Sequence, residues 1–305
     1  MRKISILFLF SLLVAGCRPK PSPTILIDPA LITLVPADTI FLAGARMEPI
    51  RSTEVYKKYV LNQKIEMLDE FTKKTGMDPR SDLWEFLIAG NGKDTMVMAR
   101  GHFEEMGMEP KLAIEGAQRF VYKGFTLLGD ETRAVVFTNS STAVAGPTAV
   151  LRRLIDHRTH PDSGAPKWLT ERAAVIPSTN QIWFVGSVAG QMEQLAPKRA
   201  AQGMNFGQFL DALQLLTAQI DLQTGVKVRA EGLCVTEIDA RRLNDALRAG
   251  LGLARLSTGD ANPQLLRLID GVKVIQQQKT VLVDINWPLA AMDELMKLAP
   301  PLKAR

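Results

Sequence analysis

Three histidines are the first candidates for chemistry in this 305-residue chain, because imidazole changes charge near neutral pH and binds metals. His157 and His160 lie in the stretch DHRTHPD, whose imidazoles and carboxylates suit zinc or a similar ion. The stretch also ends a predicted helix, where positive side chains interact favourably with the helix dipole. We therefore expect a solvated helix end, with His157 and His160 as weak metal candidates. His102 has no second ligand nearby in the sequence, and we expect it to be structural.

Cys234 is the next reactive side chain, and it lies in the alternating stretch VKVRAEGLCV. Neither a helix N-terminus nor a histidine lies beside it to lower the pKa of its thiol, so we expect a buried, unreactive cysteine. The sequence has no Gly-x-Ser-x-Gly elbow, no phosphate-binding loop and no His-Glu-x-x-His motif. The sequence therefore predicts no catalytic residue, no metal and no cofactor, although carboxylates far apart in sequence can still converge in a fold.

The first sixteen residues, MRKISILFLFSLLVAG, have the order of a secretory signal peptide. Arg2 and Lys3 supply a positive start, an apolar run follows, and Ala15-Gly16 are small. The run is well short of the roughly 20 apolar residues that a membrane-spanning helix needs. We expect residues 1–16 to direct export and to be removed.

The residues Val14-Ala15-Gly16-Cys17 resemble the lipobox of bacterial lipoproteins. The resemblance implies cleavage after Gly16 and attachment of a diacylglyceryl group to the Cys17 thiol, with further acyl chains such as palmitate. It also implies a lipid-anchored protein of the cell envelope whose first partner is the membrane. Arg18 follows the cysteine where a retention signal would place Asp, which implies the outer membrane if the cell has one.

Charge excludes one class of partner. The chain has 37 basic and 32 acidic residues, a net charge of +5, and removal of residues 1–16 would lower this charge by two. Nucleic-acid binding needs Lys and Arg gathered on one face, whereas here they are mixed with acids, as in KWLTER and DARRLNDALR. We expect no nucleic-acid partner.

The mature chain divides into five parts. Residues 17–30 follow the signal peptide as a lipidated cysteine and a proline-rich tether, which we expect to be extended. A first repeat at 31–160, a linker at 161–170 and a second repeat at 171–305 come next. Two matches support the repeat: LVPADTIFLAG at 34–44 returns as VIPSTNQIWFVG at 175–186, and residues 96–101 align with 227–232.

Hydrophobic periodicity and turn signals predict an α+β fold, in which two related halves each form an antiparallel sheet with helices on one face. Asn91-Gly92 predicts a hairpin between apolar runs. The expected strands are 40–45, 86–90, 95–101, 119–130 as a meander, 134–138, 142–146, 181–185, 272–277 and 280–286. The expected helices are 52–76, 109–117, 148–158, 207–217, 240–253 and 289–298, with a second hairpin turning at 223–225.

The residues Leu34-Val35-Pro36-Ala37-Asp38-Thr39, placed before an apolar strand, resemble a family of bacterial envelope proteins whose domains open with a Leu-Pro-Ala-Asp-Ser/Thr turn. The resemblance implies secreted or anchored α+β domains with no established activity. The second copy departs from the pattern, because it reads Ile176-Pro177-Ser178-Thr179.

Three functions remain open. The first is a non-catalytic anchored module that binds a protein or another envelope component. The second is a carrier or sensor of an apolar ligand, for which the methionines at 96, 98, 106 and 108 could line a pocket, although methionine more often lies in the core. The third is an envelope hydrolase that uses converging carboxylates. A wide apolar cavity between helices and sheet would favour the carrier, and acids clustered in a cleft would favour the hydrolase.

Overall fold

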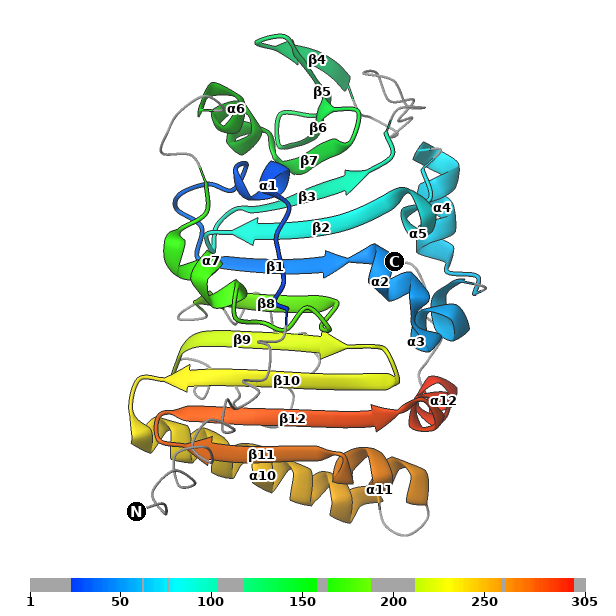
Figure 1. Ribbon diagram of the computed structural model, residues 1–305, viewed down its shortest axis with the longest axis vertical. Helices are drawn as coiled ribbons and strands as arrows, with labels where there is room; N and C mark the ends of the chain where they lie inside the picture. The colour runs from blue at the N-terminus through cyan, green and yellow to red at the C-terminus, as the bar shows by residue number, and fades with distance from the viewer. Residues whose placement is uncertain are drawn as a thin grey trace, which may run out of the picture.

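The fold is built on a single antiparallel sheet of twelve strands, in the order β11-β12-β10-β9-β8-β1-β2-β3-β7-β6-β5-β4 (Figure 1). The structure is a computed structural model that describes residues 23–61, 63–75, 77–103, 118–157, 164–187, 212–258 and 262–298. Helices lie on both faces of the sheet and at one end of its strands. The predicted α+β class is confirmed.

Most consecutive strands within each half are antiparallel neighbours, but β3 pairs with β7 instead of β4, and β10 pairs with β12 instead of β11. The first seven are β1 (Phe41–Arg46), β2 (Leu83–Gly90), β3 (Thr95–Gly101), β4 (Gln118–Tyr122), β5 (Phe125–Gly129), β6 (Arg133–Asn139) and β7 (Thr142–Pro147). The other five are β8 (Ile182–Ser187), β9 (Leu213–Asp221), β10 (Gly225–Cys234), β11 (Val272–Gln277) and β12 (Thr280–Pro288). The predicted hairpin at Asn91-Gly92 is confirmed, because Gly92 has a positive φ and Asn91 Oδ1 accepts from two backbone amides of the loop.

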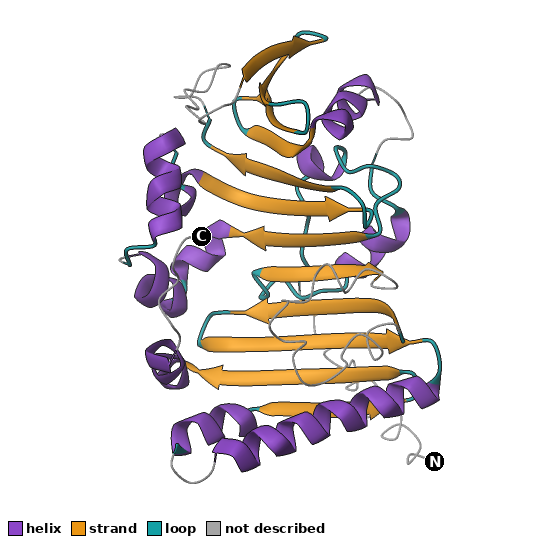
Figure 2. Ribbon diagram, turned by 180° about the vertical axis from the view of Figure 1, so that it is seen from behind, coloured by secondary structure: helices purple, strands orange, loops and turns teal. Residues whose placement is uncertain are grey.

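The helices group by position around the sheet (Figures 1 and 2). Those on the front face in Figure 1 are α1 (Pro29–Ile32), α6 (Thr148–His157) and α7 (Lys167–Ala173), and those behind it are α10 (Glu237–Thr258) and α11 (Pro263–Asp270). At one end of the strands are α2 (Met47–Ser52), α3 (Glu54–Tyr56), the π-helical turn Lys57–Leu61, α4 (Glu66–Thr75), α5 (Pro79–Asp82) and α12 (Leu289–Leu298). The helices predicted at 148–158, 240–253 and 289–298 are confirmed.

The first strands of the two halves, β1 and β8, lie side by side at the centre of the sheet. Their register sets Gly44 opposite Trp183 and Phe41 opposite Gly186. A side chain at Gly44 would overlap the Trp183 ring, and one at Gly186 would overlap Cα and Cβ of Phe41, whose ring lies against Gly90 of β2. A turn closed by a proline carbonyl precedes both strands, Thr39 N–H to Pro36 and Asn180 N–H to Pro177. These features belong to one continuous sheet, and descent of one half from the other stays a prediction.

Two apolar cores lie on opposite faces of this sheet. The larger core, on the face covered by α6, includes Leu42, Leu87, Met98 and Leu151, all with no exposed area. The smaller core lies under α10 and includes Cys234, Leu243 and Val281 among others. Side chains alternate between the two faces along each strand. In the observed register, the apolar side chains lie on one face at the β7 end of the sheet and on the other face at the β11 end. Helices therefore cover different faces at the two ends.

The N-terminal segment, residues 23–28, runs across the front of the sheet and is bound to it (Figure 1). Ile25 is only 3% exposed, and its amide donates to the Ile176 carbonyl. At the other end of the segment, Asp28 pairs with Arg100 at 2.9 Å and its Oδ1 accepts from the Ala30 amide at the start of α1. The predicted tether at 17–30 is therefore wrong for residues 23–30, because burial of Ile25 and the ion pair hold them against the body.

Three further predictions differ from the structure. Residues 213–217, predicted as part of a helix at 207–217, belong to β9, because pairing with β8 and β10 outweighs the helix propensity of their Leu and Gln residues. The predicted helix 52–76 is broken into the short helices named above. The predicted linker 161–170 includes the start of α7, whose Leu169 is fully buried. The helix predicted at 109–117 lies outside the described residues.

Replacement of Gly44 by alanine tests the junction of β1 and β8. The added methyl group would overlap the Trp183 ring, so we expect Gly44→Ala to lower the free energy of unfolding by about 1–3 kcal/mol, the usual cost of overpacking. Gly252→Ala is the matched control, because Gly252 lies in α10 with open space around it; alanine there should raise stability by about 0.5–1 kcal/mol. Urea titration measures both, and equal effects at the two sites would contradict the role given to Gly44.

The carboxyl of Glu85 makes stability depend on pH. Burial raises the pKa of Glu85 above its ordinary value of 4.5, and the Asp28 charge adds to this, although the Asp28 amide, Arg46 and Arg100 act in the opposite sense. A raised pKa in the folded state means that the protonated form is favoured there, so stability falls as the pH rises from the unfolded to the folded pKa. We expect Glu85→Gln to gain unfolding free energy relative to the parent protein as the pH rises above 4.5. Urea titrations between pH 4 and 7 measure the difference, and a constant difference would contradict the burial of this charge.

Candidate functional site

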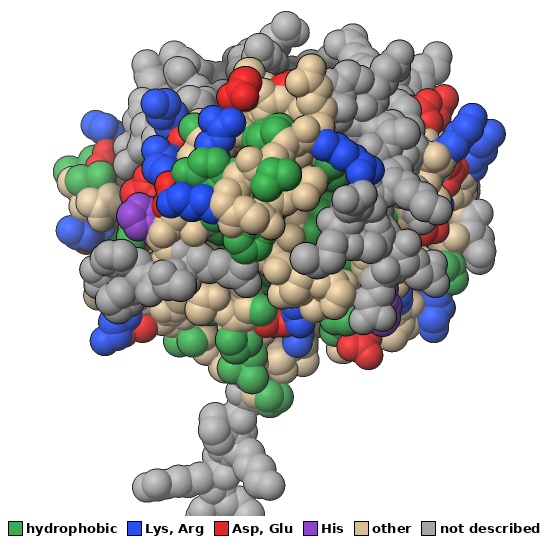
Figure 3. Space-filling view, turned by 90° about the horizontal axis from the view of Figure 1, so that it is seen from above, with side chains coloured by type: hydrophobic (Ala, Val, Ile, Leu, Met, Phe, Trp, Pro, Cys, Tyr) green, Lys and Arg blue, Asp and Glu red, His purple; other side chains and the backbone are tan. Residues whose placement is uncertain are grey.

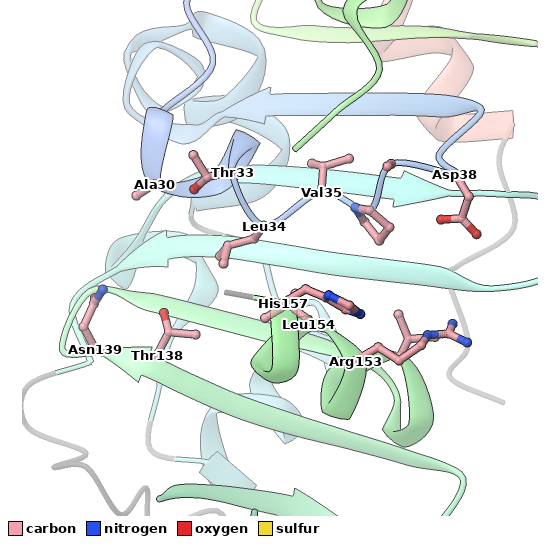
Figure 4. A pocket seen from close by; sticks show the side chains of 13 residues that line it. Ala30, Thr33, Leu34, Val35, Asp38, Thr138, Asn139, Arg153, Leu154 and His157 are labelled. Carbon is pink, nitrogen blue, oxygen red and sulfur yellow. The ribbon is translucent and has the colours of Figure 1, made fainter. Parts of the chain in front are cut away.

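A pocket of about 590 Å³ opens on the front face, between residues 30–38 and helix α6 (Figure 4). One wall is the end of α1 and the turn that leads into β1; the other is α6, and the end of β6 closes it. Its lining residues are Ala30, Thr33, Leu34, Val35, Pro36, Ala37, Asp38, Thr138, Asn139, Val150, Arg153, Leu154 and His157. The volume is within the usual range for sites that bind small molecules.

The floor of the pocket is apolar and joins the larger core. Val35 and Val150 are 1% and 5% exposed, which fixes their positions in the fold. Leu34 and Leu154 are half-buried and pack against the same core from opposite walls. A ligand in the pocket would therefore cover apolar surface that the fold leaves partly open to water.

The turn in the first wall is held by its own hydrogen bonds. The Leu34 and Val35 amides donate to the carbonyls of Leu31 and Ile32, and the Thr39 amide donates to Pro36. Asp38 Oδ2 accepts from Asn91 Nδ2 at 2.7 Å, which ties the turn to the hairpin of β2 and β3. The wall is thus built before any ligand arrives, as most small-molecule sites are.

Polar groups lie at the two ends of the pocket (Figure 4). Thr138 and Asn139 are at one end, and Asp38 and Arg153 are at the other. Arg153 is 3.8 Å from the Asp94 carboxylate with its side chain 61% exposed, so this pair holds it weakly. His157 follows Arg153 by one turn of α6 and also reaches the pocket. Arg153 and His157 can donate to a negative group on a ligand, while the Asp38 carboxylate at the same end accepts from Asn91.

The polar lining side chains Asp38, Thr33 and Thr138 are engaged within the fold. Asp38 is the one carboxylate among them, and it is engaged by Asn91. The Thr33 and Thr138 hydroxyls each donate to a backbone carbonyl, of Pro29 and Thr142 respectively. Both hydroxyls are therefore engaged with the backbone. The arrangement can bind an apolar body and a charged or polar group.

Of the two predicted metal candidates, His157 and His160, the structure describes only His157. His157 lies at the pocket, whereas His160 lies outside the described residues, as does Cys17 with its expected lipid. Asp156 accepts a hydrogen bond from Tyr122 and pairs with Lys123 at 2.6 Å; the Lys123 bond is the main factor that lowers the pKa of Asp156. Within the described part of the chain, no group of three or more His, Cys, Asp or Glu side chains could hold a metal ion.

The other predicted residues have structural positions. His102 is exposed and packs edge-on against Trp84, with 4.7 Å between ring centres. Cys234 is fully buried as predicted, and burial raises the pKa of its thiol. Met96 and Met98 belong to the larger core and do not line the pocket, while the methionines at 106 and 108 lie outside the described residues.

The sequence indicated the wall formed by the turn at 34–39 but not the wall formed by α6 and the end of β6. The turn at 34–39 was recognisable as a motif, although nothing in it indicated a binding site. Arg153, Thr138 and Asn139 were missed because each stands in a segment whose pattern indicates only a helix or a strand. Their common position depends on the pairing of β6 with β7 and on the packing of α6.

None of the helices in the described part of the chain is long and apolar enough to cross a membrane. No protein-family model matches this chain, and no curated protein sequence is significantly similar to it. Among solved structures, crystal form III of TP0453 superposes with a TM-score of 0.53 at 9% sequence identity, covering 90% of this chain and 99% of TP0453. Crystal form I of TP0453 gives a TM-score of 0.49 at the same identity, covering 90% and 98%. At this identity the chain is similar to TP0453 in fold alone.

Proposed function

We propose that this protein is a non-catalytic binding module of the cell envelope, anchored through a lipid on Cys17, and that the α6 pocket binds a small amphiphile with an apolar body and an anionic group. The observation that carries the proposal is the pocket itself: a half-buried apolar floor, with Arg153 and His157 at its rim. The sequence left three functions open. Of these, the carrier of an apolar ligand is the one that a wide apolar cavity between helices and sheet favours.

The energetics favour an apolar ligand of moderate size. Burial of apolar surface contributes about 25 cal/mol per Å², so contact with Leu34, Leu154 and their neighbours can hold a short hydrocarbon chain. A charge placed near Arg153 adds selectivity more than affinity, because this end of the pocket is exposed to solvent. A fatty-acid-like carboxylate fits both features.

The anchor and the body lie close together in this proposal. Residues 23–28 are bound to the sheet, and the Ser178 amide donates to the Pro23 carbonyl at 2.8 Å. Only residues 18–22 then separate Cys17 from the body, and at about 3.5 Å per residue they reach no further than about 20 Å. We expect the Pro23 side of the protein to face the membrane that holds the lipid.

Filling the pocket tests the binding site. In Leu154→Trp, the larger side chain occupies the space for the ligand, and we expect decanoate to bind at least tenfold more weakly by isothermal titration calorimetry. Ala149→Trp is the matched control, because Ala149 is exposed on the same helix and does not line the pocket; its affinity should equal that of the parent protein.

The head group is tested in the same assay with decanoate, decanol and decylamine. Arg153→Gln should weaken decanoate binding while leaving decanol unchanged, and decylamine should bind least. No binding of any of the three ligands to the parent protein, or equal loss in Leu154→Trp and Ala149→Trp, would refute the pocket.

The lipid anchor is tested in the cell. We expect labelled palmitate to be incorporated into the parent protein and not into Cys17→Ser, because serine cannot form the thioether. Cys234→Ser is the control, since Cys234 is buried and should leave the label unchanged. A parent protein that takes up no label would contradict the lipobox prediction.

A further inference from the structure

The outer edge of β11 is an open edge of the sheet. Among the strands that the structure describes, β11 is the terminal one and pairs with β12 alone. The unpaired backbone groups of such an edge can accept another strand. Among the described residues, no backbone hydrogen bond joins this edge to another segment.

The hairpin between β11 and β12 determines which backbone groups point outward. Its two-residue loop, Gln278-Lys279, is closed by the facing pair Gln277 and Thr280. In such a hairpin the closing pair is hydrogen-bonded, and bonded and non-bonded pairs then alternate along an antiparallel ladder. The Asn286 amide bonds to the Gly271 carbonyl in agreement with this alternation. The amides and carbonyls at 272, 274 and 276 therefore face outward.

Helix α10 turns this edge into a groove. It runs along β11 on the back of the sheet, nearest the viewer in Figure 2, and a groove of about 500 Å³ lies between them. Leu251 of α10 and Val272 and Val274 of β11 give it apolar walls, whereas Ile275, which is 42% exposed, alternates with them and lies on the other face of the edge. An added strand would bond to β11 with its backbone and set alternate side chains against these walls.

The two charged residues at this edge are positive and lie on either side of it. Arg248 and Lys273 are exposed, and neither forms an ion pair with a described residue. Lys273 alternates with Val272 and Val274, so it lies on the face opposite α10, across from Asp284 of β12. Other arginines of α10 are already engaged: Arg241 with Glu237, Arg242 with Asp239 and Arg255 with Asp270. Positive charge thus lies on both faces of the β11 edge, where acidic side chains of an added strand would complement it.

From this geometry we infer that the β11 edge binds an extended acidic peptide segment of a partner protein, which adds to the sheet as a thirteenth strand beside α10. The site is separate from the α6 pocket, and the inference does not depend on the function proposed for that pocket. A second copy of this chain is disfavoured, because pairing two β11 edges would bring Lys273 and Arg248 of both copies together.

The opposite edge of the sheet is a poorer site. β4 has five residues and pairs with β5 alone. Figure 3 looks down on this end of the molecule, where Lys and Arg side chains surround apolar ones. Val121 of β4 is 72% exposed, whereas Arg152 lies over the rings of Phe120 and Tyr122.

Fluorescence anisotropy with short peptides tests the inference. The probe is a fluorescein-labelled octapeptide of alternating valine and glutamate, and its counterpart carries lysine in place of glutamate. We expect the purified protein to bind the glutamate peptide at least tenfold more tightly than the lysine peptide. A fully N-methylated glutamate peptide, which keeps the charge but cannot donate hydrogen bonds, should lose at least tenfold in affinity. Saturating glutamate peptide should slow hydrogen exchange at the Val274 and Gln276 amides.

Charge reversal locates the site. The double variant Arg248→Glu and Lys273→Glu should bind the glutamate peptide at least tenfold more weakly and should gain affinity for the lysine peptide. Lys93→Glu with Arg172→Glu is the control, since it makes the same change in net charge at exposed residues away from the groove. The inference is overturned if no peptide binds, if N-methylation has no effect, or if both double variants behave alike. Self-association lost in the groove variant would assign the edge to a second copy instead.

Discussion

The reciprocal contact of glycine and aromatic residues between β1 and β8 is the constraint on which the rest of the structure depends. Gly44 leaves room for Trp183 on one face, and Gly186 leaves room for Phe41 on the other. Phe41 also stacks on Phe184 with 5.8 Å between ring centres. Because both faces are filled at the junction, the two runs of strands join as one sheet, and their register fixes which side chains reach each face.

That register explains why the two ends of the molecule differ. On the front face, the apolar stripe from β1 to β7 is covered by α1, α6 and α7, and the N-terminal segment closes its middle. Toward β11 the same face carries Lys227, Arg229 and Asp284, and the apolar stripe has passed to the face under α10. The pocket and the edge groove lie where each helix covers its stripe incompletely: α6 leaves Leu34 and Leu154 half-buried, and α10 leaves the edge of β11 open.

Both proposed sites combine apolar contact with charge. The pocket joins an apolar floor to a weakly held arginine, and the β11 edge joins outward backbone groups to two cations that form no ion pair with a described residue. Each therefore selects a ligand by shape, apolar contact and charge. The ion pair of Asp28 with Arg100 joins the N-terminal segment to β3 of the sheet. This attachment brings the expected lipid anchor close to the folded body.

The sequence by itself determined several local strands and the turns that end them. Asn91-Gly92 specified a hairpin, the alternation of 272–277 and 280–286 specified two strands, and the burial of Cys234 followed from its apolar neighbours, because these depend on residues close in the chain. Only the tertiary structure decided that 213–217 is strand, since its pairing with β8 and β10 overrides local propensity. It also decided the pocket, where the turn at 34–39 meets Arg153 across more than a hundred residues of chain. Contacts of that separation arise from packing and register, which no local pattern contains.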